Sequence, residues 1–67
     1  MTKRREVVVD VPRMLNLVQQ HIESKDQALK DSAQSVLSAL VLNLNHKQAV
    51  LKPEMRPHVL RLERTEQ

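Results

Sequence analysis

The chain of 67 residues contains no cysteine, no glycine and no aromatic residue. Without cysteine it can form neither disulfides nor thiolate metal sites. Without glycine, turns and helix ends must be made with Asn, Asp, Ser or Pro, and the familiar phosphate-binding loop of glycine amides is excluded. Without aromatic rings the core must be aliphatic, and binding of single-stranded nucleic acid by base stacking is disfavoured.

The small size of the chain favours self-association. A domain of this length buries only about 60% of its unfolded surface, and each aliphatic side chain contributes about 1.5–3 kcal/mol when fully buried. Such domains usually gain stability from disulfides, a metal or oligomerisation. The three histidines are 25 and 12 residues apart, too far for a helical zinc pair. We therefore expect no metal, no cofactor and a homodimer.

Positive charge lies at both ends of the chain. Eleven Lys and Arg stand against eight Asp and Glu, giving a net charge of +3, and nine of the eleven cations fall within residues 1–13 and 47–67. This distribution suits an anionic partner. No apolar run approaches the roughly 20 residues that span a bilayer, and no signal-peptide core is present. We expect a soluble, cytoplasmic protein without a membrane partner.

The start of the chain predicts a strand that leads into a helix. We interpret residues 1–4 as a flexible basic arm and residues 5–11 as a strand rich in β-branched residues. Its valines at 7, 9 and 11 share one face. Pro12 cannot donate to a β-ladder but suits a first helical turn, so a helix is expected from about Pro12 to Glu23.

A second amphipathic helix follows. Ser24-Lys25-Asp26-Gln27 has the form of a capping box and predicts a break there; one unbroken helix, or a start at Asp31-Ser32, is the alternative. The helix is expected to reach about Lys47, with Asn43 and Asn45 as residues that could end it, or to continue to Leu51 before Pro53. Its apolar stripe comprises Leu29, Ala33, Val36, Leu37, Leu40, Val41 and Leu44. Leu42 lies off this stripe and suggests a second contact surface, as a dimer would supply.

The last residues are expected to form a partly ordered tail. We place the strand-helix-helix domain at residues 5–52 and the tail at residues 53–67. Within the tail, residues 58–64 fit a short helix and a strand equally well.

No motif for a reaction is present. The candidate nucleophiles and bases lie outside any nucleophile motif, so we expect no enzyme. These candidates are Ser32, Ser35, Ser38, His21, His46 and His58.

The order of basic arm, strand, Pro12 and two helices over residues 3–46 resembles the ribbon-helix-helix repressors and antitoxins. In that resemblance Lys3-Arg4-Arg5-Glu6-Val7-Val8-Val9-Asp10-Val11 is the ribbon and Pro12–Glu23 the first helix. It implies an obligate homodimer in which the strands of two chains pair and enter the DNA major groove.

We therefore expect a mostly α-helical protein, with a short N-terminal strand followed by two helices, that forms a ribbon-helix-helix-like dimer. The alternative fold is a β-α-α-β monomer in which residues 7–11 pair with residues 59–62. The nucleic-acid-binding residues are expected to be Lys3, Arg4, Arg5, Glu6, Val8 and Arg13. The dimer and core interface is expected to comprise Val7, Val9, Val11, Val18, Ile22, Leu29, Val36, Leu37, Leu40 and Leu44.

The expected function is that of a small dimeric DNA-binding protein, a transcriptional regulator, repressor or antitoxin-like protein. The alternative is a non-enzymatic helical module for protein–protein interaction, an adaptor, inhibitor or assembly factor of the kind that phages and plasmids encode. Exposure of Leu42 together with Val59, Leu60 and Leu62 would favour this alternative.

Overall fold

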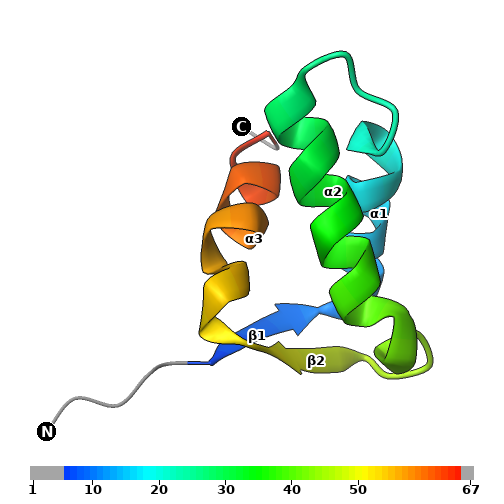
Figure 1. The fold of residues 1–67 in the computed structure, drawn as a ribbon. Helices are drawn as coiled ribbons and strands as arrows, with labels where there is room; N and C mark the ends of the chain where they lie inside the picture. Colours follow the sequence, from blue (N-terminus) through cyan, green and yellow to red (C-terminus); the bar gives the residue numbers. More distant parts are fainter. Residues whose placement is uncertain (1–5, 66–67) are drawn as a thin grey trace, which may run out of the picture.

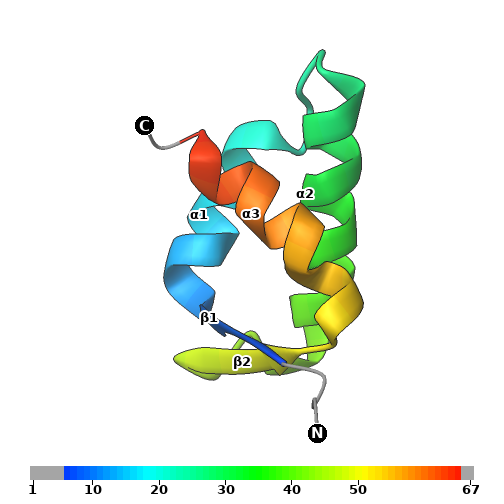
Figure 2. The same cartoon turned by 90° about the vertical axis from the view of Figure 1, so that its left-hand side faces the viewer.

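The computed structural model describes residues 6–65, which form three α-helices standing on a two-stranded sheet (Figure 1). The helices lie side by side, and the sheet closes one end of the helical layer, as the perpendicular view also shows (Figure 2). The elements in chain order are β1 (Val7–Asp10), α1 (Val11–His21), α2 (Gln27–Leu40), the 3₁₀ turn η1 (Val41–Asn43), β2 (Gln48–Leu51), the 3₁₀ turn η2 (Pro53–Met55) and α3 (Arg56–Arg64).

The sheet joins the beginning of the chain to its later part. β1 and β2 are antiparallel, with Val7 opposite Leu51 and Val9 opposite Ala49. These four side chains are buried against the helices. Because side chains alternate along a strand, the residues between them point to the outer face of the sheet.

Aspartates begin the first two helices. The Asp10 carboxylate accepts a hydrogen bond from the backbone N–H of Arg13, and the Asp26 carboxylate accepts one from Ala28. Such N-caps satisfy amides that have no partner within the helix. The expected break near Ser24 is confirmed, but the cap is Asp26; the Ser24 hydroxyl instead accepts from the N–H of Asp26 in the connecting loop.

The core is aliphatic and draws on all three helices and both strands. Leu17 is fully buried, because α1 contacts both α2 and α3. The buried apolar residues among those described are Val7, Val9, Val11, Met14, Leu17, Val18, Ala33, Val36, Leu40, Ala49, Leu51, Val59 and Leu62.

The second helix is shorter than expected. α2 ends at Leu40, η1 follows, and Gln48–Leu51 forms a strand instead of continuing the helix toward Leu51. Leu51 fits both a helical and an alternating pattern, whereas Ala49 fits only the alternating one. Pairing with β1 decides between them, because it satisfies the strand backbone and buries both side chains in the core.

Residues 58–64 are helical, so a strand in this segment is wrong. The alternative fold, in which residues 7–11 pair with residues 59–62, is also wrong, because β1 pairs with β2. The chain does follow a β-α-α-β order, but β2 supplies the closing strand and α3 comes after it.

The C-terminal segment belongs to the same core as the rest of the described chain. Val59 and Leu62 of α3 are buried there, so the boundary expected after Lys52 does not divide the packed unit. The coarse expectation of a mostly helical protein, with a strand followed by two helices, is confirmed.

We predict that Leu62→Ala lowers the free energy of unfolding by about 2–5 kcal/mol, because it leaves a cavity in a close-packed core. The matched control is Leu60→Ala, on the exposed side of the same helix, which should change stability by less than about 0.5 kcal/mol. Urea unfolding followed by circular dichroism measures both. Equal effects of the two substitutions would mean that α3 does not pack as described.

Candidate functional site

A serine, a histidine and an arginine meet between α2 and α3. The Ser32 hydroxyl lies 3.0 Å from Nδ1 of His58, and Nη1 of Arg61 donates to the same oxygen at 3.2 Å. Because a guanidinium can only donate, the Ser32 oxygen accepts from Arg61, and its own O–H can donate to Nδ1 of a neutral His58.

The burial of Ser32 decides what this cluster does. Its side chain is fully buried, so a substrate cannot reach the hydroxyl oxygen in this structure. The cluster instead satisfies a polar group inside an apolar core, where an unpaired hydroxyl would be costly. No buried side-chain nitrogen or oxygen among the described residues lacks a hydrogen-bond partner. Ser32, His58 and Arg61 thus tie α3 to α2.

Two further polar contacts tie α1 to α3. The Thr65 hydroxyl donates to the carbonyl oxygen of Leu62 at 2.6 Å, so its oxygen accepts from Nε2–H of His21 at 2.9 Å. Arg13 forms an ion pair with Glu63 at 3.1 Å. Arg13, expected to contact phosphate, is therefore engaged in a contact within the fold.

The other expected nucleic-acid-binding residues divide into two groups. Glu6 and Val8 are exposed, and Val8 lies on the outer face of the sheet opposite Val50. Lys3, Arg4 and Arg5, and the basic arm at residues 1–4, lie outside the described residues.

Eight of the ten expected interface residues lie in or against the core of this single chain. Leu37 and Leu44 are at its surface. Those in the core are Val7, Val9, Val11, Val18, Val36 and Leu40, and those partly buried against it are Ile22 and Leu29.

The sheet and the turn that follows α2 lie at the same end of the molecule (Figure 1). Both carry exposed apolar side chains. Leu42 is 89% exposed, Val8 is 61% exposed and Val50 is 57% exposed. We call the following set the sheet-end surface: Val8, Val41, Leu42, Leu44 and Val50. Isolated apolar residues at a surface are ordinary, but several at one end of a small protein are typical of a contact site.

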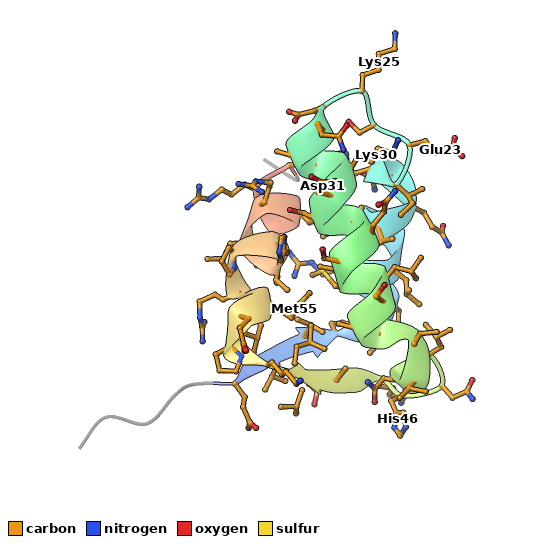
Figure 3. All side chains as sticks on the ribbon, in the orientation of Figure 1. Glu23, Lys25, Lys30, Asp31, His46 and Met55 are labelled. Carbon is orange, nitrogen blue, oxygen red and sulfur yellow. The ribbon has the colours of Figure 1, made fainter. Side chains whose placement is uncertain are left out.

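The outward side of α3 carries a different surface. Leu60 is 42% exposed, and a shallow hollow beside it is lined by Pro57, Leu60, Arg61 and Arg64. Other charged side chains gather at the far end of the molecule, around the α1–α2 loop, where Lys25 points away from the fold (Figure 3). The sequence did not single out the α3 surface, because a strand was equally compatible with residues 58–64.

The described residues offer no group of three His, Asp or Glu side chains that could hold a metal ion. His21 contacts Thr65, the residue after α3, and His58 contacts Ser32 of α2. His46 lies at the sheet end (Figure 3). Within residues 6–65, none of the helices has the length and apolar character needed to cross a membrane.

Comparison with known proteins adds no relative: no family model, no curated protein and no solved structure matches this chain.

We predict that Ser32→Ala lowers the free energy of unfolding by about 1 kcal/mol relative to Ser35→Ala, because it removes the hydroxyl that joins His58 and Arg61. Ser35 is one turn further along α2 and only partly buried. Both substitutions gain the same helix propensity, so the difference isolates the buried contacts. Equal stabilities in thermal or urea unfolding would show that the cluster contributes nothing.

Proposed function

We propose that this chain is a non-enzymatic interaction module that works as a homodimer, with two copies meeting at the sheet-end surface. The observation that carries the proposal is the exposure of Leu42, Val8 and Val50 at one end of the molecule. Burying each such side chain contributes about 1.5–3 kcal/mol. A chain without aromatic residues has few other means of increasing its buried apolar area.

A second copy is the occupant that the size of the chain favours. The core contains only aliphatic and methionine side chains, and small domains commonly gain stability from self-association. In a two-fold dimer both copies use the same surface, so each valine or leucine of that surface contributes one buried side chain from each copy. Sequence analysis named the exposure of Leu42, Val59, Leu60 and Leu62 as the feature that would favour an interaction module. Leu42 and Leu60 are exposed, whereas Val59 and Leu62 belong to the core.

We predict that the chain sediments as a dimer at micromolar concentration and that Val50→Lys raises the dimer dissociation constant by at least about a hundredfold, since the loss of apolar burial occurs twice. The control is Gln34→Lys, an equal charge change at an exposed position of α2. Analytical ultracentrifugation measures both. A monomer at every concentration, or a dimer that Val50→Lys leaves intact, would contradict the proposal.

A DNA-binding regulator is the second candidate, supported by the open edge of β1. The N–H of Val11 donates to the carbonyl of Lys47, its opposite residue. Bonded and non-bonded pairs alternate in an antiparallel ladder, so the N–H and C=O of Val8 point away from β2. Two copies could therefore pair along this edge as a ribbon-helix-helix ribbon, giving a sheet in the order β2-β1-β1-β2.

The charge distribution supports this second candidate through the residues before Glu6. Residues 6–65 contain eight Lys and Arg against seven Asp and Glu, a net charge of only +1, whereas the whole chain carries +3. Arg13 is paired with Glu63, and Asp10 caps α1. The exposed residues that remain here are Val8, on the outer face of β1, and Glu6, just before the strand. Phosphate contacts would therefore depend chiefly on Lys3, Arg4 and Arg5.

We predict for this candidate that binding to duplex DNA weakens steeply with salt and that Arg4→Ala plus Arg5→Ala reduces the slope of log K against log salt by about 2 per chain. Lys25→Ala plus Lys30→Ala removes the same charge at the far end of the molecule (Figure 3) and should leave the slope unchanged. Fluorescence anisotropy with a labelled duplex measures the slopes. Absence of binding at low salt would end this candidate.

A further inference from the structure

We propose that the outward side of α3 is a docking site for an acidic, amphipathic segment of a partner protein. This inference rests on the interaction-module function above and adds a second surface, distinct from the one at which two copies meet. It starts from the order of residues in α3. Arg56, Leu60 and Arg64 recur at intervals of four, so they follow one another along one side of the helix.

The residues on the inner side of α3 contact the rest of the chain. Val59 and Leu62 lie in the core, and the Glu63 carboxylate is bonded to Arg13 of α1. Glu63 is the acidic residue of the helix, and it is turned to that ion pair. The outward side therefore combines the guanidinium of Arg64 with Leu60, and both side chains are exposed.

The hollow on this side has both a cationic and an apolar lining. Pro57 and Leu60 supply its apolar atoms, while Arg61 and Arg64 supply its cations. The hydrogen bond from Arg61 to Ser32 holds the guanidinium at this place. A guanidinium has five N–H donors, and the bond to Ser32 uses one of them. Arg61 can therefore also donate to a carboxylate. Because the side chain is already held by Ser32, this second contact costs little conformational entropy.

The mixture of arginine and leucine favours an acidic peptide over a nucleic-acid backbone. Carboxylates form bidentate hydrogen bonds with guanidinium groups, and phosphates do so equally well. A phosphate backbone, however, gains nothing from Leu60 and Pro57, and the chain has no aromatic ring on which a base could stack. A helix that presents glutamates beside leucines matches both parts of the surface.

The test uses the full-length chain and a synthetic helical peptide in which glutamates and leucines recur at helical spacing. A second peptide with Gln in place of every Glu, and a short DNA duplex, are the comparison probes. We expect the acidic peptide to bind, with Arg64→Glu and Leu60→Ser each weakening it about fivefold to tenfold. Lys25→Glu, the same charge reversal at the far end of the molecule, should have no more than about a twofold effect at physiological salt. Anisotropy titrations give the affinities, and amide shifts of the labelled chain locate the contact.

The outcomes separate this inference from the function it rests on. Peptide binding that depends on Arg64 and Leu60, with shifts at α3, supports it. Binding of the duplex without the acidic peptide, or equal loss in Lys25→Glu, overturns it, as does absence of peptide binding by a folded chain. Ultracentrifugation of the same samples keeps the two proposals apart, because dimerisation at the sheet end can persist when docking at α3 fails.

Discussion

The pairing of β1 with β2 is the constraint on which the rest of this structure depends. It brings Val7 opposite Leu51, two positions far apart in the chain, and buries both beneath the helices. The helical segments at either end of the pair are positioned by it. Asp10, the last residue of β1, caps α1, and η2 and α3 follow β2 after a single residue, Lys52. The sheet thus determines where α3 begins, and with it which side of α3 meets the core.

The helical layer is then secured by three polar contacts that all involve the C-terminal segment. Ser32 joins α2 to His58 and Arg61, Arg13 joins α1 to Glu63, and His21 joins α1 to Thr65. Because the core lacks large aromatic side chains, such contacts add specificity to a packing that aliphatic residues alone define loosely. These contacts also determine which charged side chains are paired within the chain and which remain on its surface. Arg13 and Glu63 are joined to each other, while Arg64 stays on the outward side of α3 beside Leu60. The surfaces proposed for contact, at the sheet end and on α3, are what the fold leaves outside these internal contacts.

The parts of the fold that sequence analysis predicted correctly are those with local physical causes. A β-branched strand before Pro12, an amphipathic helix after it and a polar break near Ser24 each depend on neighbouring residues. The candidate site was harder to foresee. Ser32 and His58 are 26 residues apart, and nothing in their own neighbourhoods indicates that they meet. Arg13 looked available for phosphate because its partner, Glu63, lies 50 residues away. Asp10 also has a role that the strand pattern does not show. Its carboxylate points to the outer side of β1 because it caps α1.

The sequence by itself determined the aliphatic core, the break between the first two helices and the alternating valines of β1, because these follow from residue type and from periods of two or 3.6 residues. Only the tertiary structure decided that Gln48–Leu51 is a strand and that α3 completes the core. Leu51 satisfies both periods, and the free energy that favours the strand over the helix comes from pairing Ala49 with Val9 and Leu51 with Val7, which lie 40 and 44 residues earlier in the chain. Short segments of this kind have weak intrinsic preferences. Their structure, and the surfaces they leave exposed, therefore follow from the contacts they make in the folded chain.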